Sequence, residues 1–336
     1  MKWRVLAGAV ALAALAWSGW WFFSANLREE ALAGWLEARR AEGWQAGAAA
    51  IRTGGFPNRI DTRLVEPALA DPAAGWAWRA PFLDVLTLAY EPNAAILAFP
   101  PEQSLAAPGA RALLTSERLR ASIRFVPGPS LALARLSAVG EGLSLAGEGW
   151  RAGAADAEAH VEAVRPAVEN AYRLFLGAGA VTLPEGVRSR LDVAGALPAV
   201  AERLRIDAVA TFDRPLDRFA LEDAPPGVRA LSIRSLEARW GDLALTAKGD
   251  LRADAAGYAE GSLDVRAENW RAMLRAAVAA GALDANTAGL IEGGLGLLAR
   301  LSGDGDALSA PLSFSGGAAR IGPVPIGEAP RLMPPG

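Results

Sequence analysis

The apolar positions of this chain form one long run near its start and short alternating runs after it. Residues 5–23 read VLAGAVALAALAWSGWWFF, and none of these 19 residues is charged. A helix needs roughly 20 residues to cross a hydrocarbon core of about 30 Å. The pattern therefore predicts a transmembrane anchor over residues 5–23.

The flanks of this run predict its orientation. Lys2 and Arg4 fall within residues 1–4, and basic residues favour the cytoplasmic side of a membrane. We therefore expect residues 1–4 to be cytoplasmic and the bulk of the chain to lie on the far side. Aromatic residues collect at membrane interfaces, so the expected anchor contacts are Trp20, Trp21, Phe22 and Phe23.

A cleaved signal peptide is the alternative interpretation of this segment. Such a peptide ends in a site with small residues, and here the bulky Phe23 precedes Ser24 and Ala25. We therefore expect an anchor that is not cleaved.

The next segment, residues 24–43, predicts a stalk helix that continues the anchor. Leu27, Leu32, Trp35 and Leu36 recur at helical spacing among charged residues. The apolar stripe can pack on the following domain, or it can lie on the bilayer with Trp35 in contact with lipid. Both interpretations are kept at this point.

From residue 44 onward, short alternating runs predict strands, and Gly and Pro mark the turns between them. Ile60, Thr62 and Leu64 alternate with charged residues, and Trp76 and Trp78 flank Ala77. The fold class is therefore mainly β (α+β): an N-terminal transmembrane helix and stalk, and then a curved antiparallel β-sheet with a pair of C-terminal helices.

Helices are predicted chiefly at about residues 269–301. Asn269 is placed to cap a helix from Trp270 toward Ala280, and Asp284 is placed to cap a second helix that ends at Leu301. A smaller helix is a weaker prediction for residues 195–203.

Two segments correspond at a constant offset of 100 residues, for example Leu131 with Leu231 and Leu143 with Leu243. Each copy predicts a β-hairpin, with its turn at residues 140–142 or 241–242. A real repeat implies two related β-units, residues 44–200 and 201–336. Chance similarity in a chain rich in Ala and Leu is the alternative.

The composition limits which cellular compartment and which classes of partner are expected for this chain. The net charge is −3 with acids and bases interspersed, unlike the basic face of a protein that binds nucleic acid. The chain contains no cysteine, which excludes disulfides and thiolate chemistry. With the anchor, this composition predicts a single-pass protein of the inner (cytoplasmic) membrane, with most of the chain in a bacterial periplasm.

Three stretches carry a family resemblance. They are residues 54–59 (GGFPNR), 240–270 (WGDLALTAKGDLRADAAGYAEGSLDVRAENW) and 321–327 (IGPVPIG). Together they resemble the bacterial envelope family known as domain of unknown function 2125, in which an aromatic residue is favoured where this chain has Asn58. The leucine-rich strands are similar, more distantly, to AsmA-like envelope proteins. The resemblance implies an envelope location and a β fold, and no established activity.

The one histidine lies in a polar row of Asp156, Glu158, His160 and Glu162. Alternate residues of a strand stand about 6.5 to 7 Å apart, which is too far for a compact metal site, so a solvated face is the preferred interpretation. A Ser-His-Asp triad is not excluded, but the Gly-x-Ser-x-Gly signature of a nucleophile is missing. We therefore expect no metal, no cofactor and no enzymatic activity.

The leading functional hypothesis is lipid binding or shuttling in the cell envelope. The anchor, the 52% hydrophobic content and the AsmA-like pattern motivate it. Trp76 and Trp78, on one face of a strand, are the candidates for contact with an acyl chain or the membrane. The alternative is an envelope scaffold that binds other proteins and carries no lipid. Expected partners are the inner membrane, phospholipid and other envelope proteins, and not nucleic acid.

Overall fold

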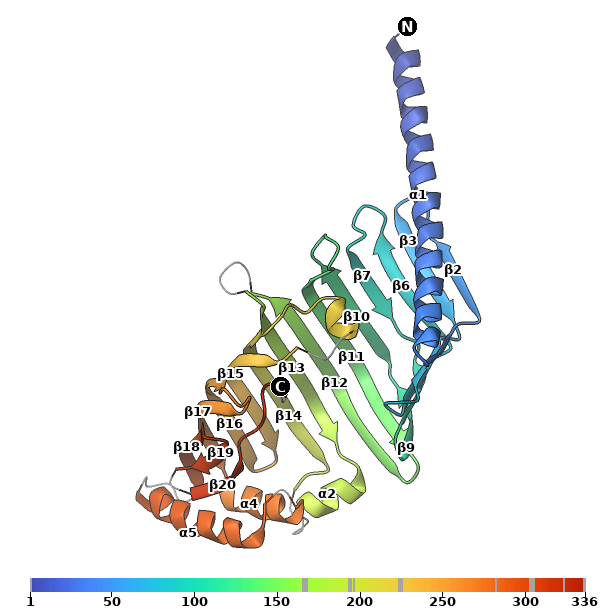
Figure 1. The fold of residues 1–336 in the computed structure, drawn as a ribbon. Coiled ribbons are helices and arrows are strands. Elements are labelled where there is room, and N and C mark those ends of the chain that lie inside the picture. Colours follow the sequence, from blue (N-terminus) through green and yellow to red (C-terminus); the bar gives the residue numbers. More distant parts are fainter. Residues whose placement is uncertain are drawn as a thin grey trace. The chain divides into compact units, whose positions relative to one another are not determined.

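The computed structural model describes residues 2–164, 169–192, 195, 197–222, 226–281, 283–301, 306–322 and 324–334. Met1 and Pro323, which belong to predicted features, lie outside these residues. The strands form an antiparallel, open, mainly β architecture, as predicted. The chain divides into an N-terminal unit, Met1–Arg124 with Leu145–Glu148, and a C-terminal unit, Phe125–Ser144 with Gly149–Gly336 (Figure 1).

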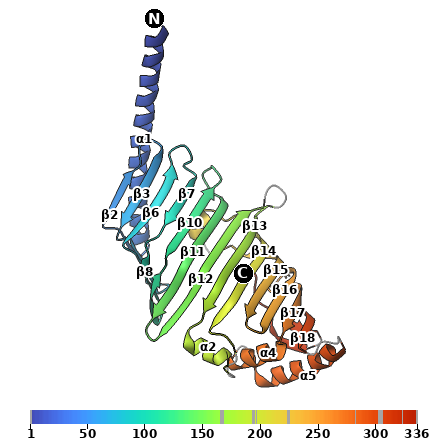
Figure 2. The ribbon, with the colours of Figure 1, turned by 180° about the vertical axis from the view of Figure 1, so that it is seen from behind.

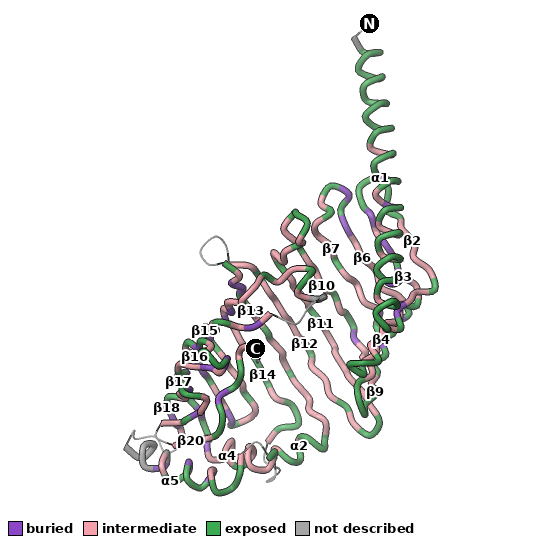
Figure 3. The backbone as a smooth tube through the Cα atoms, viewed as in Figure 1, coloured by how far each residue is buried: buried purple, intermediate pink, exposed green. Residues whose placement is uncertain are grey.

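The N-terminal unit begins with a single helix, α1 (Lys2–Ala41). The predicted anchor and stalk are therefore one continuous helix without a break. Its first half projects beyond the strands of the unit, whereas its second half runs along them (Figure 1). In Figure 3 residues 3–16 of α1 are all exposed, and buried or intermediate positions occur from Trp17 onward.

Ten short strands follow in the N-terminal unit. They are β1 (Gln45–Gly47), β2 (Ala50–Gly54), β3 (Arg59–Val65), β4 (Ala68–Asp71), β5 (Trp76–Arg79), β6 (Phe82–Leu88), β7 (Ala94–Ala98), β8 (Glu102–Ala107), β9 (Ala110–Thr115) and β10 (Arg118–Phe125). Antiparallel pairing joins β1, β4, β5, β8 and β9 in one ladder, and β2, β3, β6, β7 and β10 in a second. The two ladders therefore have the same order of places. β1 and β2 hold the first place, β4 and β3 the second, β5 and β6 the third, β8 and β7 the fourth, and β9 and β10 the fifth.

Proline explains several of the breaks between the two ladders. Pro67 separates β3 from β4, Pro81 separates β5 from β6, and Pro100 and Pro101 separate β7 from β8. Proline has no N–H to donate to a ladder. The carbonyl groups of these prolines can still accept hydrogen bonds. For example, Glu66 N donates to the Pro81 carbonyl oxygen at 2.8 Å.

The C-terminal unit is a meander. Its strands are β11 (Leu133–Gly147), β12 (Trp150–Ala163), β13 (Ala171–Thr182), β14 (Val200–Phe212), β15 (Val228–Trp240), β16 (Leu243–Ala253), β17 (Ala259–Glu268), β18 (Ala307–Ser315), β19 (Ala318–Ile321) and β20 (Val324–Glu328). The last three residues of β11 belong to the N-terminal unit. From β12 to β20 each strand pairs antiparallel with the next strand in the sequence. Figure 2 shows β12 to β16 side by side from behind.

Helices accompany this meander, namely α2 (Glu185–Leu191), α3 (Phe219–Glu222), α4 (Trp270–Ala279) and α5 (Ala285–Leu301). The predicted C-terminal pair is confirmed as α4 and α5. Asp284 caps α5 as expected, because Thr287 N donates to its carboxylate at 2.9 Å. Asn269 precedes α4 as expected, but its side chain makes no capping bond and its backbone is left-handed, with φ of 56°.

The C-terminal core lies between one face of the meander and the elements that cover it. Ile291 of α5 and Trp270 of α4 pack on Leu308 and Ala310 of β18. A second cluster places Leu251, Leu263 and Phe314 against β19 and the chain near Ala329.

Two local predictions are wrong. Residues 200–203 begin β14 and are not helical, because cross-strand pairing with β13 and β15 outweighs the weak helical pattern. The turn expected at residues 140–142 is also absent, since β11 runs through it and the chain turns at Glu148 and Gly149 instead. Gly142 takes a left-handed φ of 59° within the strand. The glycine therefore adopts the backbone conformation typical of a turn, but the chain does not reverse there.

The second predicted hairpin is confirmed as β15–β16, with its turn at Gly241 and Asp242. Residue 200, the predicted boundary between two related β-units, is the first residue of β14 within the C-terminal unit. That the two segments descend from a duplication stays a prediction.

Candidate functional site

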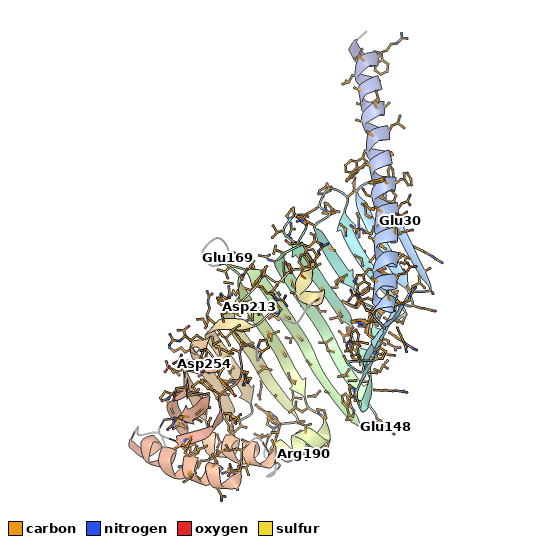
Figure 4. All side chains as sticks on the ribbon, in the orientation of Figure 1. Glu30, Glu148, Glu169, Arg190, Asp213 and Asp254 are labelled. Carbon is orange, nitrogen blue, oxygen red and sulfur yellow. The ribbon has the colours of Figure 1, made fainter. Side chains whose placement is uncertain are left out.

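The first part of α1, residues 3–16, stands clear of the sheet. Every residue from Trp3 to Ala16 is exposed, and the side chains there stand clear of other elements (Figure 4). The segment Trp3–Ala41 is the one candidate among the described residues that is long and apolar enough to span a membrane. The helix is therefore consistent with the predicted anchor.

The four predicted anchor aromatics divide into two groups. Trp20, Phe22 and Phe23 are 52%, 59% and 62% exposed, whereas Trp21 is only 4% exposed. The indole of Trp21 packs on Ile60 and Ala89. Its Nε1 donates to the Arg59 carbonyl oxygen at 2.6 Å. Trp21 therefore ties the helix to the sheet, while its neighbours face outward.

The second half of α1 packs on the N-terminal unit through part of the predicted apolar stripe, whereas Leu27 of that stripe is 53% exposed. Contact of Trp35 with the bilayer stays a prediction. Leu36 is 4% exposed, and Arg28 Nη1 donates to Thr87 Oγ1 at 2.6 Å. Burial lowers the pKa of Arg28, and the nearby negative charge of Asp61 partly opposes that effect. Trp35 is 46% exposed and lies beneath the guanidinium of Arg39.

The predicted lipid contacts Trp76 and Trp78 lie on β5 and are partly buried within their own unit. Trp76 meets Trp44 edge-on at 5.2 Å between ring centroids. Trp78 meets Phe99 edge-on at 6.5 Å, and its Nε1 donates to Gln103 Oε1 at 2.9 Å. Both rings are thus packing elements. Their contact with lipid stays a prediction.

One face of the C-terminal unit carries a row of apolar side chains. Directly opposed residues in neighbouring strands share a face, and Leu176 of β13 opposes Ala159 of β12 and Ile206 of β14. We call the residues of this face that are not buried, on the three strands, the apolar strip. Its members are Ala157, Ala159, Val161, Leu174, Leu176, Ala178, Leu204 and Ile206.

The apolar strip is the uncovered part of a longer row. From Ile206 the opposed residues continue through Leu236, Ala247, Val265 and Ala310, and Ala310 is buried under α4 and α5. Toward the other end of β13 and β14 the same face is buried again, since Tyr172, Ala208 and Ala210 are 4%, 2% and 1% exposed, and Leu216 N donates to the Tyr172 hydroxyl at 3.1 Å. Between the two covered parts, Leu176 and Leu204 are 55% and 54% exposed. The sheet therefore presents an open apolar floor beside a closed core.

Two hollows in the described residues combine charged and apolar lining. One hollow of about 580 Å³ in the C-terminal unit has charged lining residues, among them Arg234, Lys248 and Asp264, together with Leu236, Ala247, Val265 and Ala310 of the row that continues the apolar strip. Another of about 610 Å³ in the N-terminal unit is lined partly by Arg79, Arg111 and Glu148. Charges of both signs around these hollows do not favour an acyl chain.

The face of β12 opposite the apolar strip brings three side chains into line. His160 Nδ1 lies 2.7 Å from Ser137 Oγ on β11, and His160 Nε2 lies 3.0 Å from Glu158 Oε2. In chemical terms the imidazole could accept the hydroxyl proton of Ser137. The sequence pointed to His160 and Glu158 but missed Ser137, because the register of β11 beside β12 cannot be predicted from either strand alone.

This arrangement lacks other parts that acyl transfer needs. His160 and Glu158 are 37% and 40% exposed at their side chains, so water has free access. A triad also requires donors aimed at an oxyanion, and backbone N–H groups within long strands bond to neighbouring strands. Among the described residues, no group of three or more His, Asp and Glu side chains is placed to hold a metal ion.

The fold and the site together define a mainly β protein with an N-terminal helix suited to a membrane. The sequence profile of the family described as "Uncharacterized protein conserved in bacteria (DUF2125)" matches residues 21–330. The match covers nearly the whole chain, and the chain belongs to this family, so the predicted resemblance is confirmed. No curated protein and no solved structure matches the chain. The more distant similarity to AsmA-like proteins stays a prediction.

Proposed function

We propose that this chain is an inner-membrane protein whose periplasmic part binds lipid on the apolar strip and passes it on, without catalysing a reaction. The observation that carries the proposal is the exposure of Leu176 and Leu204 on an apolar sheet face that is closed elsewhere by α4 and α5. Exposed apolar patches of this kind mark sites of interaction.

The expected affinity of the apolar strip for an acyl chain is low enough for the lipid to exchange. An acyl chain that removes about 200 Å² of apolar surface from water gains about 5 kcal/mol, at roughly 25 cal/mol per Å². Association costs about 4–15 kcal/mol in lost freedom. One chain on an open floor therefore binds weakly and leaves readily, which favours shuttling over storage.

The direction of the anchor supports a periplasmic location. Lys2 and Arg4 precede the apolar run, and basic residues favour the cytoplasmic side. The rest of the chain then lies beyond the inner membrane, where a lipid carrier has access to lipid leaving the bilayer.

An envelope scaffold is the second candidate, and the edge of β2 favours it. Within the part of the chain that the structure describes, β2 pairs with β3 on one side only. An extended segment of another protein can add to such an edge. A scaffold would need no lipid on the apolar strip.

Native mass spectrometry of the full chain, released from detergent, tests the proposal. Lipid held by α1 is common to all variants, so the difference between variants reports the apolar strip. Leu176→Asp should reduce the bound phospholipid. Val187→Asp, at an exposed apolar residue of α2, is the matched control and should retain it. Equal lipid on wild type and Leu176→Asp would favour the scaffold.

A further inference from the structure

The tip of the β2–β3 hairpin is fastened to α1 near the point where the helix leaves the sheet. Trp17 Nε1 donates to the Pro57 carbonyl oxygen at 2.9 Å, and Phe22 stacks on Phe56 with 5.9 Å between centroids. Trp21 meets Phe56 edge-on at 5.5 Å. The tip therefore lies at the same height along the helix as residues 17–22.

The length of the part of α1 that stands clear of the sheet determines the depth at which the β2–β3 tip lies in a bilayer. Trp3–Ala16 is 14 residues long and spans about 21 Å at 1.5 Å per residue. The hydrocarbon core is about 30 Å thick, so the free part alone is too short to cross it. A crossing of about 20 residues from Trp3 extends to Phe22, the residue on which Phe56 is stacked.

The chemistry of the tip suits that position. Residues 54–58 (GGFPN) carry no charge, and Phe56 is 50% exposed despite its aromatic contacts. The first charged residues after the tip, Arg59 and Asp61, form an ion pair at 2.9 Å. Gly55 is required for the turn, because its φ is 100° and an added Cβ would lie 2.9 Å from the Cβ of Arg59.

A second tip lies at the same height. Ala89 N, just beyond β6, donates to the Asn58 carbonyl oxygen at 2.9 Å, and Ala89 packs on Trp21. The next residue, Tyr90, is 68% exposed. Tyrosine and phenylalanine at such a level match the apolar and polar layers of a membrane interface.

We propose that the β2–β3 and β6–β7 tips insert Phe56 and Tyr90 into the interface of the bilayer that α1 crosses, beside Trp20, Phe22 and Phe23. The N-terminal unit is then held against the membrane surface in a set orientation instead of hanging from a free stalk. This inference rests on the proposed role of α1 as an anchor. The occupant of the surface is the lipid interface, because the same helix continues from it into the bilayer.

The absence of native cysteine allows the test with single labels on the full chain. The chain is reconstituted in vesicles of phosphatidylethanolamine and phosphatidylglycerol, with an NBD fluorophore on Asn58→Cys, Tyr90→Cys, Trp35→Cys or Leu12→Cys. Asn58 is exposed, so its label spares the aromatic contacts. Trp35 is the matched control, exposed on the same helix about 20 Å beyond Phe22.

Lipids brominated near the headgroup should quench most of the fluorescence at positions 58 and 90, and little at position 35. Lipids brominated deep in the chain should quench position 12. If position 12 is quenched but positions 58 and 90 remain as bright as position 35, the anchor stands and this inference is wrong. Loss of quenching at position 12 would overturn the anchor and the inference together. Strong headgroup quenching at both position 35 and position 58 would mean that α1 lies flat on the bilayer, which also overturns the inference.

Discussion

Asp207 of β14 and Arg173 of β13 form a two-point ion pair across neighbouring strands, with oxygen–nitrogen distances of 2.6 and 3.1 Å. The hydrogen bonds from Arg173 are the main cause that holds the pKa of Asp207 below its ordinary value, and desolvation only partly opposes them. The folded chain therefore keeps this carboxylate ionised to lower pH than the unfolded chain does.

This difference predicts the sign of a pH effect. The contribution of Asp207 to stability is complete above the pKa of the unfolded chain, about 3.9, and is lost as the pH falls through the lower folded pKa. Asp207→Asn should therefore be less stable than wild type near neutral pH, and the gap should narrow as the solution is acidified below about pH 4. Thermal unfolding of both proteins over this range measures the gap. A gap that is constant with pH would contradict the assignment.

Neighbouring tryptophans of α1 should differ sharply in their effect on stability. Trp21→Ala should lower the free energy of unfolding by about 3 kcal/mol or more, as for other buried large side chains. It also leaves the Arg59 carbonyl without the indole donor. Trp20→Ala is the matched control, since Trp20 is 52% exposed. Thermal unfolding in detergent compares the two, and equal losses would show that Trp21 does not hold the helix to the sheet.

Gly249 should not tolerate a side chain. Its φ is 148°, and an added Cβ would lie 2.2 Å from the Ser262 carbonyl oxygen on β17. Gly249→Ala should therefore cost more than about 2 kcal/mol or prevent folding. Gly186→Ala in α2 meets nothing within 4 Å and should be neutral or stabilising by up to about 1 kcal/mol. Denaturant unfolding of both variants gives the comparison.

Ser137 should behave as an ordinary serine in spite of its contact with His160. A nucleophilic serine needs donors aimed at an oxyanion, whereas backbone N–H groups within long strands bond to neighbouring strands. Its side-chain partners are also accessible to water. A fluorophosphonate probe should label wild type and Ser137→Ala to the same low level. Selective labelling at Ser137, confirmed by peptide mapping, would revive a hydrolase.

Local patterns predicted the elements that depend on local physics. The apolar run and the helical spacing after it predicted α1, Asp284 predicted the start of α5, and the Gly241 turn predicted the β15–β16 hairpin. Each of these rests on residues close together in the sequence, so one stretch of chain contains the whole signal.

The rest depended on contacts between distant segments. Trp21 belongs to the aromatic group expected at the membrane, but its partners Ile60 and Ala89 are brought to it only by folding. The apolar strip likewise depends on the register of β12 to β14. The alternation of each strand is visible in the sequence, but which part of a face stays uncovered is decided by where α4, α5 and the chain after β14 pack.

The sequential meander of the C-terminal unit has a consequence for how the protein is made. Because each strand from β13 to β20 pairs with the strand just before it, its partner has always been synthesised first. Contacts of short sequence separation form quickly. This sheet can therefore grow one strand at a time as the chain emerges, and the most recent strand is the growing edge that needs protection from aggregation.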